Sequence, residues 1–119
     1  MSVQTRSQKL AQEAFARIAK RGKLNQEFVS FAKKFPALIH TCGLAQAVAF
    51  ALAKKQTDYV DDLAAVLQAS GHPEVSSRDT LQKQTREQPL SGYLRLSRDT
   101  INAASWLKRY VEAAVGEGD

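Results

Sequence analysis

The chain of 119 residues contains a single cysteine, Cys42, and no long apolar run. One cysteine excludes an internal disulfide and suits a reducing, cytoplasmic environment, where we expect the protein to reside. No apolar stretch approaches the roughly 20 residues that a membrane-spanning helix needs. The first residues lack the apolar core of a secretory signal, although their Arg-rich amphipathic pattern is like that of a transit peptide. The sequence therefore predicts neither a disulfide nor a membrane partner.

Turn-forming and strand-forming residues are also scarce. Three prolines and six glycines are too few for the many turns of an all-β fold. Eighteen alanines stand against eleven valines and isoleucines, a ratio that favours helix over sheet. A folded chain of this length buries roughly two-thirds of its unfolded surface, which is enough for a core. We expect an all-α fold, with residues 1–119 forming a single domain, a compact bundle of about five to six helices.

Residues with the chemistry of catalysis or metal binding are few. His40 and Cys42 form an H-x-C pattern, but the third and fourth ligands of a zinc site are missing, and the other histidine, His72, lies in an expected loop. The sequence has no Gly-rich phosphate loop, no G-x-S-x-G and no H-E-x-x-H motif. Asp61 and Asp62 are adjacent, so on a helix they point about 100° apart and make no carboxylate pair. The sequence predicts a protein that is not an enzyme and has no metal or cofactor.

Acidic residues are fewer than basic ones, 12 against 17, which gives a net charge of +5 at pH 7. Such an excess attracts polyanions, namely nucleic acid, anionic lipid or an acidic protein. Many ordinary domains carry as much charge, so a basic surface that only faces solvent would explain the same composition.

The apolar pattern predicts two helices in the first part of the chain. Thr5 and Gln8 form a capping-box pattern for a helix over 5–21. Its apolar face is expected to join the core and comprises Leu10, Ala11, Ala14, Phe15 and Ile18. The second helix starts at Asn25, and its apolar stripe crosses Pro36, so this helix either kinks there or stops and restarts in phase.

Two more helices are expected before residue 70. The stretch 43–54 is apolar on nearly every side, which is typical of the central helix of a bundle, and we expect it to be the most buried helix. Gln46 would then be a buried amide with hydrogen-bond partners. Thr57 is expected to cap a helix over 58–69.

The last part of the chain admits more than one interpretation. Residues 78–88 can form a short helix, but Leu81 is its only large apolar side chain, so we expect this part to be weakly held. The stretch SGYLRLSRDTINAASWLKRY, residues 91–110, could be a strand followed by a helix, or one helix. A strand would have no partner elsewhere, whereas one helix gathers the apolar residues on one face. We therefore expect a single long helix over 91–115.

Basic residues gather on two helix faces, each opposite an apolar stripe. They are Arg6, Lys9, Arg17 and Lys20 on the first helix and Arg95, Arg98 and Arg109 on the last. Trp106 and Tyr110 border the second face, but no base-reading motif is present, so both faces suit backbone phosphates without sequence preference. Solvated faces with intrahelical ion pairs, such as Arg95 with Asp99, would explain them equally well.

Two motifs resemble a known family. GLAQAVAF at 43–50 and YLRLSRDTINAASWLKRY at 93–110 are similar to the small subunit of the type III-B CRISPR effector, the Cmr complex. KKFPALI at 33–39 and TRSQKLAQEAF at 5–15 also fit, so the resemblance covers nearly the whole chain in the same order.

The resemblance implies an all-helical, non-catalytic subunit of an antiviral complex. Its partners would be the other Cmr subunits, further copies of itself, and guide RNA and target RNA. Several copies would stack beside the backbone subunits, and their basic surface would help line the channel where target RNA pairs with guide RNA. The seven basic residues above are the candidates for RNA contacts, and the sequence leaves open which of them contact protein instead. Target cleavage would belong to the backbone subunits.

An acidic turn at the start of the fourth helix, Asp58, Asp61 and Asp62, offers a protein interface. If copies stack head to tail, unlike surfaces must meet, and this turn would contact a basic patch on another copy or a backbone subunit.

Two other functions remain open from the residues. A stand-alone DNA-binding regulator would need a helix-turn-helix, for which 78–88 is a poor recognition helix, and a protein-binding adaptor bundle would need no nucleic acid.

Overall fold

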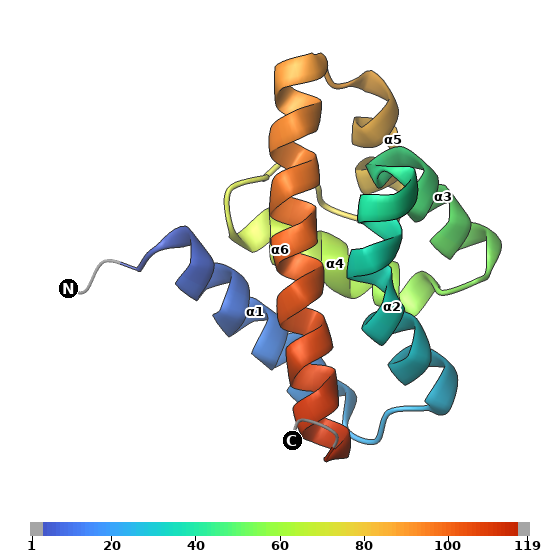
Figure 1. Ribbon diagram of the computed structural model, residues 1–119. Coiled ribbons are helices and arrows are strands. Elements are labelled where there is room, and N and C mark those ends of the chain that lie inside the picture. Colours follow the sequence, from blue (N-terminus) through green and yellow to red (C-terminus); the bar gives the residue numbers. More distant parts are fainter. Residues whose placement is uncertain (1–3, 117–119) are drawn as a thin grey trace.

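A computed structural model describes residues 4–116 of the chain (Figure 1). The elements in chain order are α1 (Arg6–Arg21), α2 (Gln26–Cys42), α3 (Leu44–Ala53), α4 (Thr57–Ala69), α5 (Arg78–Glu87) and α6 (Leu90–Val115). Helices hold 81% of the described residues, and no strand occurs among them. The prediction of an all-α bundle of five to six helices is therefore confirmed. None of the helices over 4–116 is long and apolar enough to span a bilayer.

The 26-residue helix α6 is the element around which the others pack. Figure 1 shows it running the full height of the molecule, with α1 and α4 crossing behind it and α2 alongside. Its most extensive packing is against α1 and α2. Its fully buried apolar side chains are Leu96, Ala103, Ala104, Leu107 and Val111. The expected single helix is confirmed and begins one residue earlier than predicted, at Leu90, directly after its N-cap Pro89. The proline ring disfavours a helical backbone for the residue before it, and Gln88 is accordingly extended.

The most deeply buried helix is α4, not α3. Its buried apolar side chains are Tyr59, Val60, Leu63, Ala64, Val66 and Leu67. Helix α3 lies at the edge of the bundle against α2, α4 and α5, and it leaves Gln46, Ala49 and Ala53 exposed. The expectations of a central 43–54 helix and of a buried Gln46 were therefore wrong. Alanine tolerates either environment, so an alanine-rich helix does not reveal which of its faces is covered.

Helix α2 continues through Pro36 without a break. Its four largest buried side chains flank the proline on both sides and hold the helix against the core: Phe28, Phe31, Phe35 and Ile39. The predicted starts of α1 and α2 are both confirmed. The Asn25 side chain accepts a hydrogen bond from the N–H of Phe28 at 2.7 Å, and Thr5 and Gln8 form a complete capping box for α1.

Gly43 alone joins α2 to α3. It is the C-cap of the first helix and the N-cap of the second, with φ +85° and ψ 162°, a conformation that favours glycine. The hydroxyl of Tyr93 from α6 accepts a hydrogen bond from the N–H of Ala45 at 3.1 Å. The glycine and the tyrosine of the two family-like motifs thus meet at one corner of the bundle.

Residues 78–87 form a well-defined helix, α5, rather than a weak segment. Ser77 and Thr80 make a capping box at its start, and Leu81 is fully buried. One large apolar side chain is enough to hold α5 in place, because Leu81 is packed in the core that the other helices share. A helix of this length gains most of its stability from such packing.

Candidate nucleic-acid interface

Three arginines from two helices surround the carboxylate of Asp99. Arg6 of α1 lies 3.8 Å from it, and Arg95 and Arg98 of α6 lie 3.9 and 3.7 Å from it. Asp99 is buried, whereas the arginine side chains are 48%, 48% and 65% exposed. We call Arg6, Arg95 and Arg98 the arginine cluster. The sequence placed Arg6 and the other two on separate faces, and the fold brings them together. Three guanidinium groups outnumber one carboxylate, so positive charge remains at the surface.

A histidine from the loop between α4 and α5 holds Asp99 in place. The Nε2 of His72 lies 2.7 Å from the Asp99 carboxylate, and its Nδ1 lies 3.3 Å from that of Glu74. His72 lies in the loop that the sequence predicted, but it is only 4% exposed. It stands 27 residues before Asp99, a separation at which no sequence pattern could have paired them. The arginines stay beyond hydrogen-bond distance of Asp99, so their N–H donors keep capacity for a ligand.

A shallow hollow lies farther along α6. It has a volume of about 270 Å³ and is lined by Ser7, Asn102, Ser105, Trp106 and Arg109. Arg109 follows Arg98 by eleven residues, which is about 16 Å along a helix. Its side chain is exposed and makes no ion pair within residues 4–116. The arginine cluster and Arg109 therefore form one basic strip along α6.

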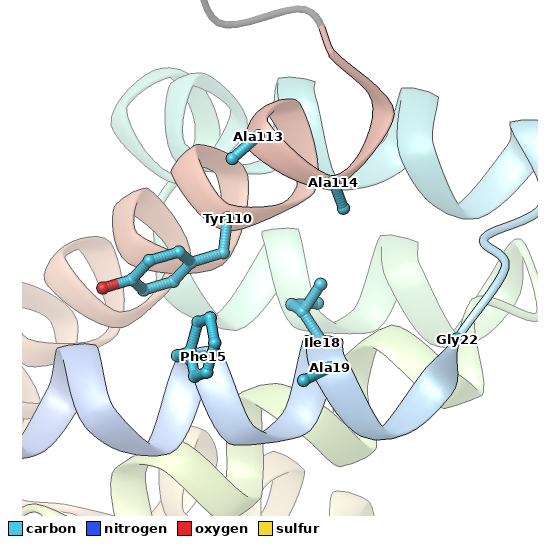
Figure 2. A pocket seen from close by; sticks show the side chains of 7 residues that line it. All are labelled: Phe15, Ile18, Ala19, Gly22, Tyr110, Ala113 and Ala114. Carbon is cyan, nitrogen blue, oxygen red and sulfur yellow. The ribbon is translucent and has the colours of Figure 1, made fainter.

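Three aromatic rings border this strip. Trp106 stacks on Tyr110 with ring centres 5.7 Å apart and an angle of 20° between the rings. Phe15 of α1 meets Tyr110 edge-on, with centres 5.4 Å apart (Figure 2). Phe15 is 57% exposed, so its expected place in the core was wrong. The sequence indicated Trp106 and Tyr110 at this border, but it gave no sign that a ring from another helix would join them.

An apolar groove continues from these rings toward the C-terminal end of α6 (Figure 2). It has a volume of about 290 Å³ and is lined by Phe15, Ile18, Ala19, Gly22, Tyr110, Ala113 and Ala114. Small residues on both helices leave the space open between α1 and α6.

The four predicted basic residues of α1 lie on one side of the helix but do not form one free basic surface, because Arg6 and Arg17 face different carboxylates. Arg17 turns toward α4, where its Nε donates to Asp62 at 2.9 Å. Lys9 and Lys20 are exposed, and Lys9 lines a separate hollow with Glu13. The strongest concentration of basic side chains is therefore on α6 with Arg6, not along α1.

The acidic residues of α4 lie at three different depths. Thr57 is the first residue of this helix instead of its cap, so Asp58 is the acidic residue of the first turn, while Asp61 and Asp62 follow one turn later. Asp58 has a side chain that is 70% exposed. Asp61 is partly buried and accepts two hydrogen bonds from Arg78, at 2.8 and 2.7 Å, which raise the pKa of that guanidinium.

Asp62 is buried and bound from within the chain. It accepts hydrogen bonds from Arg17 and from Arg21, whose Nε and Nη2 lie 2.5 and 2.9 Å from its oxygens. The hydrogen bond with Asp62 raises the pKa of Arg21. Sequence reasoning missed Arg21, which stands 41 residues before Asp62. The Asp62 side chain is therefore an anchor between α1 and α4 and offers little surface to another protein.

No three side chains of His, Cys, Asp and Glu gather into a metal-binding arrangement over residues 4–116. His40 is exposed near the end of α2, and the Cys42 thiol donates to the carbonyl of Leu38 at 3.2 Å.

Comparison with known proteins identifies the family. The family model described as CRISPR-associated protein (Cas_Cmr5) matches residues 6–114. The CRISPR system Cmr subunit Cmr5 of Thermus thermophilus is 35% identical over 120 residues, which cover 97% of this chain and all of that protein. The crystal structure of a CRISPR-associated Cmr5 family protein from Thermus thermophilus superposes with a TM-score of 0.84 at 33% identity, over 95% of this chain and 99% of that one. The chain belongs to the Cmr5 family of CRISPR-associated proteins.

Proposed function

We propose that this chain is a non-catalytic subunit of a type III-B Cmr effector complex in antiviral defence. Its family membership supports this, as does the description of the Thermus protein as a Cmr subunit. Several copies would stack beside the backbone subunits in the cytoplasm, each copy a single domain over residues 1–119. Their basic surface would help line the channel where target RNA pairs with guide RNA.

The observation that carries the RNA-binding part is the basic strip, formed by Arg6, Arg95, Arg98 and Arg109. The first three surround one buried carboxylate, and their side chains are about half exposed or more. Arginine binds phosphate oxygens through two parallel N–H donors and so tracks a backbone without reading its sequence. Lys9 and Lys20 are exposed elsewhere on α1 and would add long-range attraction, while Arg17 acts mainly within the fold through Asp62.

The proposed protein interface centres on Asp58. Its carboxylate is the most exposed of the acidic turn, and Asp61 lies beside it within reach of a neighbouring subunit. Asp62 is buried beneath this interface and contributes indirectly, because its hydrogen bonds hold Arg17 and Arg21 in place. A basic patch on another copy or on a backbone subunit would complement this turn.

The RNA-binding proposal is tested with assembled complexes that carry Arg98→Glu together with Arg109→Glu. Target-RNA affinity is measured from low to moderate salt. We expect weaker binding for every RNA sequence and a log–log salt slope shallower by roughly 0.7 to 0.9 for each phosphate that the protein no longer neutralises. Both side chains are exposed and lie opposite the buried face of α6, so the fold should be retained.

The matched control is Lys83→Glu with Arg86→Glu on α5, which makes the same change in net charge at exposed positions away from the strip. Binding should fall much less in this control. Equal losses in the two variants would mean that only total charge matters, and an unchanged slope in the α6 variant, with normal incorporation, would refute the assignment. Failure of the α6 variant to incorporate would mark the strip as a protein interface.

A further inference from the structure

We propose that the hollow beside Trp106 binds an unpaired nucleobase of an RNA strand, an inference that rests on the RNA-binding role proposed above. The base would stack on the indole ring, while Arg109 holds the adjoining phosphate. The strip would then bind single-stranded RNA, or a nucleotide turned out of a duplex, more tightly than a fully paired helix.

The stacking surface is supported from behind. Tyr110 covers one face of the indole, nearly parallel to it at 20°. Phe15 contacts Tyr110 edge-on from the other helix, as Figure 2 shows. Trp106 also lines the hollow, and we place the base there, on the part of the indole that Tyr110 does not cover. Rings fixed in this way lose little freedom when a base stacks on them, and such stacking works for every base because each has a π-face.

Polar groups around the hollow match the other parts of a nucleotide. Asn102 and Ser105, one turn and one residue before Trp106, offer an amide and a hydroxyl, and Ser7 of α1 adds a second hydroxyl. An amide both donates and accepts hydrogen bonds, so it can pair with the edge of any base. Arg109 supplies the cation, and no carboxylate lines this hollow. The volume of about 270 Å³ lies close to the lower end, roughly 300 Å³, of pockets that hold small ligands.

Charge favours RNA over a second protein chain as the occupant. The hollow continues the basic strip, with Arg98 one turn before Asn102, and a protein partner would have to bring acidic groups to the same place. The apolar groove on the far side of Tyr110 has no such cations among its lining residues. The aromatic ring next to the cations is therefore the part suited to a base.

The test uses the full chain and the fluorescence of Trp106, its only tryptophan. Three probes of twelve nucleotides carry the same phosphates per strand: single-stranded RNA, an abasic strand without bases, and duplex RNA. Affinity is measured in parallel by anisotropy of labelled strands at two salt concentrations. We expect the single-stranded RNA to quench Trp106 and to bind more tightly than the abasic strand, and the duplex to quench little. A mononucleotide is added as a fourth probe and should quench only at much higher concentration, since it lacks the neighbouring phosphates.

Substitution of the ring separates stacking from charge. Trp106→Leu should weaken binding to single-stranded RNA by between about fivefold and about 150-fold, without changing the salt slope. The control Phe50→Leu removes a partly buried ring that lies beside Lys34 and Lys54 on another part of the surface, and it should leave affinity unchanged.

The outcomes distinguish this inference from the function on which it rests. Equal affinity for the RNA and the abasic strand, with no quenching, would overturn base binding while leaving phosphate binding intact. Absence of salt-dependent binding to every probe would overturn both. If Trp106→Leu fails to fold, base binding is still tested by comparing the affinities of the unsubstituted protein for single-stranded RNA and for the abasic strand. A shift to larger species on sedimentation of the chain alone, abolished by Trp106→Leu, would assign the rings to contact between copies instead.

Discussion

Replacing Asp62 by asparagine tests whether this residue is an internal anchor. The change keeps the side-chain shape but removes the charge that Arg17 and Arg21 contact through three hydrogen bonds. Each hydrogen bond to a charged group contributes about 1.5–3 kcal/mol. An amide oxygen in place of Oδ1 can still accept from Arg17 Nε and Arg21 Nη2, but without the carboxylate charge, and the amide NH2 in place of Oδ2 faces the Arg21 Nε–H as a second donor. Removing one partner of a buried ion pair costs about 3–5 kcal/mol. The arginine side chains are 28% and 24% exposed and regain some hydration, so we expect a loss of about 3 kcal/mol.

This loss translates into a melting temperature. The entropy of unfolding, about 2.1 cal/mol/K per residue, amounts to about 0.25 kcal/mol/K for 119 residues. A loss of about 3 kcal/mol therefore lowers Tm by about 12 °C. Thermal unfolding followed by circular dichroism at neutral pH and moderate salt measures it directly, and urea titration gives the free energy independently.

Asp58→Asn is the matched control, because it makes the same substitution one turn earlier. The side chain of Asp58 is 70% exposed and lies 3.8 Å from Arg21. Exposed ion pairs contribute about 0.2–1 kcal/mol, so Tm should fall by no more than about 4 °C. A similar small fall for Asp62→Asn would refute the view of Asp62 as a buried anchor. Incorporation into the assembled complex should instead depend on Asp58. We expect Asp58→Lys to impair incorporation while lowering the Tm of the free chain by no more than a few degrees.

Three further changes probe the fold. Tyr59→Phe should leave Tm unchanged or raise it slightly, because the Tyr59 hydroxyl is buried without a hydrogen-bond partner within residues 4–116 and burial raises its pKa; a fall of several degrees would reveal a partner. Leu81→Ala should cost about 2–5 kcal/mol, seen in urea unfolding, and a loss below about 1 kcal/mol would show that α5 is weakly docked. Gly43→Ala should cost about 1–3 kcal/mol through its positive φ, measured by the same titration, whereas Gly116→Ala, at the exposed end of α6, is expected to cost less.

Within one helix, the positions of the candidate site residues could be predicted from the sequence. Contacts between residues of different helices could not. The spacing of Arg98 and Arg109 on one face of α6 follows from helical periodicity, and the structure confirms that both are exposed. The meeting of Arg6 with Arg95 depends on how α1 crosses α6, and no repeat in the sequence encodes a crossing angle. Phe15 was misplaced for the same reason: it lies at the margin of an apolar stripe, and the position of the neighbouring helix decides whether such a margin is covered.

The sequence by itself determined the helices of this protein. Backbone hydrogen bonds join residues four apart, and caps such as Thr5 with Gln8 act within one turn, so composition, periodicity and capping residues locate most of the helices. Whether α2 continues through Pro36 and how firmly α5 docks depend on tertiary packing. Only the tertiary structure decided which helix is central and which charges are paired. α4 is buried more deeply than α3, Asp62 contacts arginines 41 and 45 residues away, and His72 contacts Asp99 27 residues away. Such contacts depend on the packing of many side chains at once, and a buried charge is tolerated only where that packing supplies its partner.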